Sequence, residues 1–456
     1  MRIIHLLRSL LSCGMIVSLL FFLAACGDNS GGGGGGGGSG TDSPAGTGGT
    51  SQQASGEESV KLTFGLWGAA DQVAATQKLI DIFMEKHPNI KVETVYKDWG
   101  NYWTWITAQA ASKELPDVYK MSFAYVDQYA RLGAMRPLDD FIASSGFDLS
   151  DFEQATLDYH KFEGKQVSLP RDSNTMVMYY NKDLFDQAGI PYPDKETTWT
   201  ELLPILKKLT IDKNGNMADS PNFDPKNIVQ WGIMANPSSL GDSVLEPQLH
   251  SNGATLTDEN GRITLDTPEA KEVLQFFKDL IVTHHVSTNS DTIASLGGID
   301  ILAFNSGKVA MSFGGSWNAT DYNAANINFG TILPPKFKEV KTVAQPAGYA
   351  MSPFTKNEQA AWTLLSWLIG PEGQSEMARM NDGIPASKIA QKVYLEDGDP
   401  NKQTFIDAQK YQISAPWYDG KTKLIWEILI QKLPGLFDGT QDMDKTIREI
   451  AELAGR

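Results

Sequence analysis

From Val60 onward, short apolar runs alternate with amphipathic helical patterns. Residues 61–67 and 90–96 show the β-branched, alternating character of strands. Between them, residues 71–87 carry apolar side chains three and four positions apart, which is the spacing of one helix face. A second helical pattern covers residues 101–113. Strands that alternate with helices in this way predict an α/β fold.

Later segments extend the same pattern. A turn that ends at Gly261 predicts a β-hairpin over residues 254–265. Directly after it, Thr267 and Pro268 are the residue types of a helix cap and of a first helical position, so we expect a helix to start there. A last amphipathic helix is expected over residues 443–451.

Length, charge and cysteine content narrow the class of protein. A chain of 456 residues exceeds the size of one hydrophobic core, so we expect two domains. With 39 basic and 55 acidic side chains, the formal net charge is −16, which argues against nucleic acid as a partner because phosphate backbones are bound by clustered Lys and Arg. The 2 cysteines and 6 scattered histidines do not supply the ligand sets of common zinc sites. We therefore expect no metal and no cofactor.

The N-terminal residues 1–25 have the layout of an export signal, with two arginines, no acidic residue and an apolar stretch too short to predict a transmembrane helix. The stretch ends in two alanines before Cys26 and resembles the bacterial lipobox. This resemblance implies cleavage before Cys26 and acylation of its sulfur, which would anchor the protein at the extracellular face of the membrane. The alternative is an ordinary signal peptide followed by an unmodified cysteine.

Residues 26–58 combine the anchor cysteine with a segment of low complexity, including 8 consecutive glycines. Such a composition predicts a flexible coil with a root-mean-square reach of about 30 Å. A match to a glycine-rich nucleotide-binding motif in this segment does not indicate nucleotide binding, because no strand precedes it and no apolar helix follows. We expect a tether between the membrane and the folded body.

Five sequence blocks spread over the rest of the chain resemble a known family. They are Phe64-Gly-Leu-Trp-Gly68; Leu115-Pro-Asp-Val118 followed by Ala130-Arg-Leu-Gly-Ala-Met-Arg-Pro-Leu-Asp139; Tyr179-Tyr-Asn-Lys-Asp-Leu-Phe185 with Ala188-Gly-Ile190 and Thr198-Trp-Thr-Glu-Leu202; Phe304-Asn-Ser-Gly-Lys-Val-Ala-Met311 with Gly315-Ser-Trp317; and Gly370-Pro-Glu-Gly-Gln374 with Gly383-Ile-Pro-Ala-Ser387. In this order the blocks resemble the extracellular solute-binding protein family 1 of ABC importers, especially its maltose-binding-type branch.

The resemblance implies a two-lobed α/β fold of the type II periplasmic-binding-protein kind, with hinge crossovers and a ligand cleft between the lobes. By the positions of the blocks, lobe one takes residues 59–177 and 346–386, and lobe two takes residues 178–345 and 387–456. The implied function is the capture of a carbohydrate, in particular an oligosaccharide, and its delivery to the permease subunits of an ABC importer. We expect a monomer that is not an enzyme.

A sugar cleft needs aromatic platforms for the flat C–H faces of the ligand and polar side chains for its hydroxyls. Trp67 ends the first predicted strand, and crevices in open α/β sheets lie beyond the carboxyl ends of strands. The resemblance implies two more cleft aromatics, Trp317 after a glycine pair and Trp417 in a later loop. Trp99 fits a place in the cleft and a place in a helix cap equally well. Three further tryptophans are expected to be structural: Trp199, Trp362 and Trp367.

The other candidate ligand contacts follow predicted strands or lie at the crossovers that the resemblance implies. Asp172 and Asn174 lie at the first crossover, where hydroxyl-binding side chains are implied. The remaining candidates are Met121 and Phe123 after the third strand, Asn236 in a loop, Tyr349 at the second crossover and Asp382 near the third. The loop of Asn236 lacks an aromatic residue that some relatives carry, which leaves the particular sugar open.

Two metal-binding alternatives have local support. The adjacent Tyr179 and Tyr180 are of the type that holds ferric ion, although here they lead into a segment that the resemblance implies is a structural crossover. Residues 212–216 alternate oxygen-bearing side chains like a calcium loop. The glycine comes too early and the final glutamate is missing, so a turn is the better interpretation.

Two functional alternatives also stay open. A surface-attached glycosidase would be similarly acidic and aromatic-rich, and it needs two carboxylates roughly 5 to 10 Å apart across the scissile bond. Asp139 and Asp140 are adjacent and fit a helix start better. The other alternative keeps the fold and changes the ligand to a non-sugar solute, such as a polyamine or a small anion.

Overall fold

The computed structural model describes residues 59–68, 70–195, 197–237, 241–296, 300–413 and 420–455. The predicted export signal, Cys26, the predicted tether and Trp417 lie outside these residues. The folded body, Glu57–Arg456, is one unit of the chain and is described here by itself. None of its described helices is both long and apolar enough to cross a bilayer.

One lobe is built on a five-stranded sheet with the strand order β2-β1-β3-β12-β6. Its strands are β1 (Val60–Trp67), β2 (Ile90–Lys97), β3 (Val118–Ser122), β6 (Ser168–Pro170) and β12 (Ala347–Met351). Strand β1 runs parallel to β2 and β3, whereas β12 is antiparallel to both of its neighbours. The carboxyl ends of β1 and β3 therefore meet at the same edge of the sheet.

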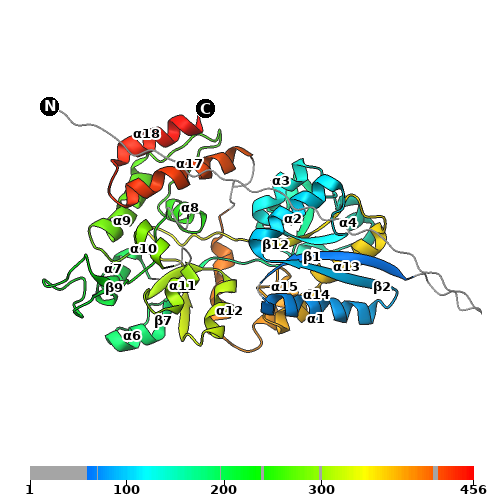
Figure 1. The fold of residues 1–456 in the computed structure, drawn as a ribbon, viewed down its shortest axis with the longest axis horizontal. Helices are drawn as coiled ribbons and strands as arrows, with labels where there is room; N and C mark the ends of the chain where they lie inside the picture. The colour runs from blue at the N-terminus through cyan, green and yellow to red at the C-terminus, as the bar shows by residue number, and fades with distance from the viewer. Residues whose placement is uncertain are drawn as a thin grey trace, which may run out of the picture. The chain divides into compact units, whose positions relative to one another are not determined.

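Helices cover both faces of this sheet (Figure 1). They are α1 (Ala70–Lys86), α2 (Trp99–Ser112), α3 (Val126–Arg131), α4 (Asp139–Ser145), α5 (Gln154–Asp158), α13 (Glu358–Ile369) and α14 (Pro371–Arg379). Because strand side chains alternate between faces, Leu62 and Phe64 pack with α1 and α13, whereas Tyr119 and Met121 pack with α2. Burial of both faces is complete at β3 and β12, whereas the edge strand β2 alternates buried residues with exposed ones such as Lys91 and Glu93.

The other lobe is built on a three-stranded antiparallel sheet with the order β10-β7-β11. Its strands are β7 (Val177–Asn181), β10 (Met311–Gly314) and β11 (Phe329–Ile332). Its helices are α6 (Lys182–Ala188), α7 (Trp199–Leu209), α8 (Gly241–Ser251), α9 (Pro268–Val282), α10 (Ser290–Ser295), α11 (Asp300–Asn305), α12 (Ser316–Ala324), α16 (Pro400–Ala408), α17 (Gly420–Phe437) and α18 (Met443–Ala454). The largest buried cluster of this lobe joins α7, α8, α9, α17 and α18 to the sheet.

Shorter elements complete the described residues. They are β4 (Lys161–Phe162), β5 (Lys165–Gln166), β8 (Ile211–Asp212), β9 (Ile228–Gln230), α15 (Lys388–Tyr394) and the 3-10 helices η1 (Phe123–Tyr125), η2 (Leu149–Asp151) and η3 (Gln409–Tyr411).

The chain passes between the two sheets three times. It leaves the first sheet after β6 and enters the second at β7, and it returns from β11 to β12. After α14 it passes over again, since α15 packs on α14 and α16 packs on β11. Figure 1 shows the connecting segments crossing the middle of the body, with the five-stranded sheet on the right and the other lobe on the left. The two-lobed α/β fold with crossovers is therefore observed.

Most predicted elements are confirmed close to their expected bounds. The helix expected at Thr267 is α9, and the Thr267 side chain accepts a hydrogen bond from the Ala270 amide. The expected hairpin over residues 254–265 is present only as a short antiparallel contact: an isolated bridge joins Thr257 to Ile263, and the Thr264 amide donates to the Leu256 carbonyl at 3.0 Å. Trp199 and Trp362 are buried as expected, with 2% and 5% of their surface exposed.

Candidate functional site

A cavity of about 630 Å³ lies between the two lobes. Its walls come from the carboxyl ends of β1 and β3, from the crossover segments, and from α11 and α12 of the other lobe. Six of the predicted ligand contacts line it: Trp67, Phe123, Asp172, Asn174, Trp317 and Asp382. Trp99, Lys120, Arg171 and Asp321 also line it. The rule that crevices open beyond the carboxyl ends of strands therefore locates this cavity.

Trp67 and Trp99 form an aromatic corner on one wall. Their ring centroids are 5.2 Å apart and their planes meet at 76°. Trp99 begins α2, directly after Asp98, whose carboxylate accepts a hydrogen bond from the Asn101 amide as the helix cap. The cap is thus Asp98, and Trp99 is left 48% exposed at the cavity.

Trp317 lies on the opposite wall, in the first turn of α12. Its indole covers Gly315, where an added Cβ would come within 2.2 Å of the ring. The other packing partners of the indole are Met176, Val343 and Ile413, which are all buried. Trp317 is therefore held by its surroundings, and its free area faces the cavity.

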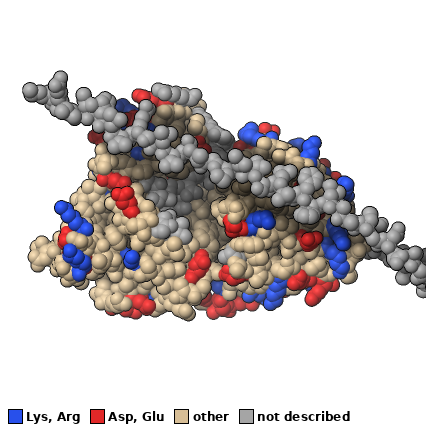
Figure 2. Space-filling model, viewed as in Figure 1, with Lys and Arg blue, Asp and Glu red and all other residues tan. Residues whose placement is uncertain are grey.

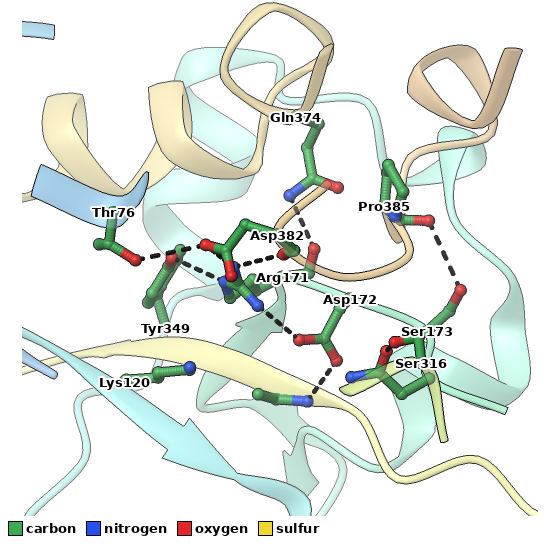
Figure 3. Close-up of polar contacts among 12 residues, drawn as sticks. Thr76, Lys120, Arg171, Asp172, Ser173, Ser316, Tyr349, Gln374, Asp382 and Pro385 are labelled. Atoms are coloured by element: carbon green, nitrogen blue, oxygen red, sulfur yellow. Dashed lines mark hydrogen bonds and ion pairs between the residues drawn. The ribbon is translucent and has the colours of Figure 1, made fainter. Parts of the chain in front are cut away.

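Arg171 links the crossover segments through a buried ionic network (Figure 3). Its Nη1 donates to Asp172 Oδ2 at 2.9 Å, and its Nη2 donates to the carboxylate of Asp382 and to the Asp382 carbonyl at 2.7 Å. Its Nε donates to the Tyr349 hydroxyl at 3.1 Å. Arg171 and Asp382 are 211 positions apart in the chain, so this contact holds the first crossover against the third.

The second crossover joins the same network. The Ala347 amide donates to Asp172 Oδ1 at 2.8 Å, and the Gln345 amide donates to the Asn174 carbonyl at 2.7 Å. The Ser316 hydroxyl, at the start of α12, donates to Asn174 Oδ1. Asp172 and Asn174 thus bring the crossovers together and also face the cavity, with 1% and 8% of their surface exposed.

Burial and neighbouring charges shift the pKa values of these groups in opposite directions. Burial raises the pKa of Asp172, although the neighbouring guanidinium of Arg171 opposes that effect. Burial also disfavours the charge of Arg171, but the carboxylates beside it, Asp382 above all, keep the pKa of Arg171 above its ordinary value. Burial raises the pKa of Tyr349 to about 12, so its hydroxyl stays protonated at neutral pH. The network is therefore a charge-paired structure at neutral pH.

Lys120 is a cavity residue that the sequence patterns did not single out. It belongs to β3, only 7% of its surface is exposed, and its ammonium lies 4.5 Å from the ring centroid of Trp67. Burial lowers the pKa of Lys120 to about 8, and the charge of Arg171 acts in the same direction. The sequence feature that could have identified Lys120 is its place inside a largely apolar strand, because a buried lysine is rare unless its charge has a role.

Three predicted contacts are not among the lining residues. Met121 alternates with Lys120 along β3, so its side chain enters the cluster beneath α2 and is fully buried. Tyr349 is buried, and its hydroxyl accepts a hydrogen bond from Arg171 Nε. Asn236 is fully buried in the second lobe. Trp417 lies outside the described residues.

Neither metal-binding alternative finds a ligand cluster here. Among the described residues, no three His, Cys, Asp or Glu side chains gather where they would bind one metal ion. The Tyr179 hydroxyl donates to the Gly315 carbonyl at 2.7 Å. Asp212 accepts hydrogen bonds from the amides of Asn214, Asn216 and Asp224, which is the pattern of the expected turn.

Charged side chains of both signs are interspersed on the face of the body that Figure 2 shows, with uncharged surface between them. Such a mixed surface does not form the single-sign stripe that binding to a phosphate backbone requires.

Residues 78–403 match the model of a family described as bacterial extracellular solute-binding protein. Among curated relatives, the maltodextrin-binding protein of Bacillus subtilis (strain 168) is 25% identical over 344 residues, which are 73% of this chain and 75% of the relative.

Solved structures share the fold. An ABC substrate-binding protein from Listeria monocytogenes in complex with cycloalternan superposes with a TM-score of 0.75 at 22% identity, covering 87% of this chain and 98% of that one. The maltose/maltodextrin-binding domain from Bdellovibrio bacteriovorus bound to maltotriose gives a TM-score of 0.68 at 20% identity, covering 87% of this chain and 99% of that one.

Proposed function

Because this chain belongs to the bacterial extracellular solute-binding proteins, we propose that it captures a carbohydrate, in particular an oligosaccharide, in the cavity between its lobes. The observation that carries this proposal is the lining of that cavity. Trp99 and Trp317 present aromatic surface from the two lobes, and residues of a buried polar network line the same cavity. A sugar ring has flat apolar faces surrounded by hydroxyl groups, so it fits a lining of aromatic and polar side chains. The sugars named for the relatives point in the same direction.

The expected affinity follows from few contacts. An aromatic ring half covered by a sugar removes roughly 100 Å² from water, which is worth up to about 2 to 3 kcal/mol before ordering costs. A hydrogen bond to a charged group adds about 1.5 to 3 kcal/mol. Two stacked rings and two such hydrogen bonds therefore reach the roughly micromolar range.

Delivery to a permease would follow from closure of the lobes. The proposed moving parts are residues 59–177 with 346–386 and residues 178–345 with 387–456, linked by the three crossovers. A ligand that contacts both walls binds the closed form more tightly and shifts the population toward it. The permease subunits of an ABC importer would then recognise the closed form, and a monomer suffices for this role.

The attachment to the membrane is proposed from the N-terminal sequence. Cys26, after removal of residues 1–25, would carry the lipid, and residues 27–58 would tether the body outside the membrane. Two or more acyl chains on one residue exceed the single chain that gives only reversible binding. The mass of the N-terminal peptide from the native membrane fraction decides this point: an unmodified Cys26 or an uncleaved signal would contradict the anchor.

Titration calorimetry with a panel of trisaccharides tests the carbohydrate proposal. The panel contains maltotriose, cellotriose, xylotriose and arabinotriose as neutral sugars, trigalacturonic acid as an acidic one and the glucosamine trimer as a basic one. Spermidine and inorganic phosphate represent the non-sugar alternative. We expect saturable binding of at least one saccharide, and no saccharide binding at millimolar concentration would reject the proposal.

Binding without catalysis is the further part of the proposal. Asp172 and Asp382 both face Arg171, so neither is placed as an isolated acid or nucleophile on one side of a glycosidic bond. The same panel incubated with purified protein should release no new reducing ends. Hydrolysis of any member would favour the glycosidase alternative.

A further inference from the structure

Lys120 is a buried cation whose hydrogen-bonding capacity is largely unused. An ammonium group has three N–H donors. Here Nζ donates one long hydrogen bond, to the Trp67 carbonyl at 3.3 Å, and rests on the Trp67 ring. Within the described residues, no carboxylate lies at ion-pair distance from it. In Figure 3 the dashed lines join Arg171 to its partners, and none reaches Lys120.

The position of Lys120 directs these donors to the cavity. Lys120 stands opposite Tyr349 in the β3–β12 register, so both side chains lie on the same face of the sheet. The Tyr349 hydroxyl accepts a hydrogen bond from Arg171. Lys120 belongs to the strand next to β1 and lines the cavity. The ammonium also covers one face of Trp67, while Trp99, Tyr102 and Trp103 pack around the same indole. Trp67 thus supports the lysine.

The charges around Lys120 balance without a charged ligand. Two cations, Lys120 and Arg171, face two carboxylates, Asp172 and Asp382, in one buried group. An acidic sugar would leave a net negative charge in this poorly solvated place, and the acidic protein as a whole would repel it. A basic sugar would add a third buried cation. Among the described residues, Asp321 on α12 is the third carboxylate that lines the cavity, and it lies on the other lobe.

We propose that Lys120 is the specificity-determining donor of the site, giving its free N–H groups to hydroxyl or ring oxygens of an uncharged saccharide and disfavouring uronates and amino sugars. This inference rests on the carbohydrate function proposed above and adds the charge class of the ligand. The aromatic faces left for stacking are then those of Trp99 and Trp317, on opposite lobes.

Three variants test the role of Lys120 against the trisaccharide panel. Lys120→Met keeps the length of the side chain and removes the donors, Lys120→Arg keeps the charge, and Lys91→Met removes an exposed lysine of β2 as the matched control. For the neutral trisaccharide bound most tightly, Lys120→Met should weaken binding about 10- to 100-fold, the range of hydrogen bonds to charged groups. Lys120→Arg should keep more of the affinity, and Lys91→Met should keep all of it.

A pH series separates a ligand contact from a structural role. Charged Lys120 is the binding form, so the affinity of the wild-type protein should fall as pH rises from 7 to 9.5, through the lowered pKa of about 8. The charged groups that face Lys120 are Arg171, Asp172, Asp382 and Asp321, and Tyr349 stands opposite it. Arg171 stays protonated in this interval, and the raised pKa of Tyr349, about 12, keeps its hydroxyl neutral. Lys120→Met should show no such fall. Its thermal midpoint without ligand should stay near the wild-type value, because no carboxylate is ion-paired with Lys120 and burial outweighs the attraction of the more distant ones, as the lowered pKa of Lys120 shows.

Each outcome bears on the inference about Lys120, on the proposed carbohydrate function, or on both. Binding of a neutral trisaccharide that depends on Lys120 and on pH supports the inference. Neutral binding that Lys120→Met leaves unchanged, or a preference for trigalacturonic acid or the glucosamine trimer, overturns the inference and leaves carbohydrate capture intact. Absence of all saccharide binding rejects the proposed function, and the inference with it.

Discussion

Single side chains in this site are held by specific neighbours, and Trp317 is the clearest case. Gly315 and three buried apolar residues hold its indole at the cavity wall. A rigid aromatic group in such a place loses little entropy when a ligand covers it.

Trp317→Ala should therefore weaken binding of the best trisaccharide by about 2 kcal/mol or more, roughly 30-fold, which is the size of an interface hot spot. Trp367→Ala, which truncates a tryptophan that packs on Phe83 away from the cavity, is the control and should keep the affinity. Calorimetry of both variants checks this, and equal affinities would remove Trp317 from the site.

His160 is a second residue whose surroundings decide its chemistry. It is fully buried, its Nδ1 lies 2.7 Å from the Ser168 hydroxyl, and burial lowers its pKa to about 3. Its Nε2 has no hydrogen-bond partner within the described part of the chain. The folded protein thus keeps this imidazole neutral, whereas the unfolded chain protonates it near pH 6.5.

The stability contribution of His160 is complete above about pH 6.5 and is lost as pH falls from there toward 3, because the unfolded state then binds one proton more. Between pH 7 and pH 5, the wild-type protein should lose roughly 2 kcal/mol more unfolding free energy than His160→Gln, which has no group that titrates there. Urea unfolding at the two pH values measures this difference. Parallel losses in both proteins would contradict it.

At the scale of elements, the crossovers depend on one buried arginine. Arg171 binds Asp172 on its own segment and Asp382 on the third, and Asp172 accepts the Ala347 amide of the second. Removing the guanidinium would leave two buried carboxylates without their ion-pair partner.

Arg171→Leu should therefore destabilise the folded protein by about 3 to 5 kcal/mol, the usual cost of breaking a buried ion pair from one side. Arg379→Leu, which breaks a pair with Glu376 through an arginine side chain that is 54% exposed, should cost less than about 1 kcal/mol. Urea midpoints of both variants test the contrast, and similar midpoints would show that the Arg171 network does not stabilise the crossovers.

The elements themselves could be predicted because their signals are local. The strand and helix patterns from Val60 to α2, and the Thr267 cap of α9, depend on residues a few positions apart. The Arg171–Asp382 contact has no such signal, since it joins positions 211 apart. In the third strand, the prediction of the cavity residue was displaced by one position. Adjacent side chains of a strand point to opposite faces of the sheet, so Met121 was expected at the cavity, whereas Lys120 lies there.

At the scale of the molecule, the cavity is shared by two lobes that only three segments connect. Under the closure proposed above, a ligand that contacts Trp99 from one side and Trp317 from the other gains both contacts in the closed form. Binding of the best trisaccharide should therefore lower the radius of gyration of the wild-type protein in small-angle scattering. Trp317→Ala at a matched degree of saturation should contract less, and an unchanged radius in the wild type would argue for a rigid body.

The packing of Trp317 over Gly315 also bears on how this site can diversify. A methyl group at position 315 would collide with the indole, so an alanine there would turn the ring away from the wall without meeting any ligand. Loss of the indole first would remove that obstacle. The two positions are therefore coupled: Gly315→Ala should weaken binding in the wild-type protein but should add little to the loss that Trp317→Ala already causes.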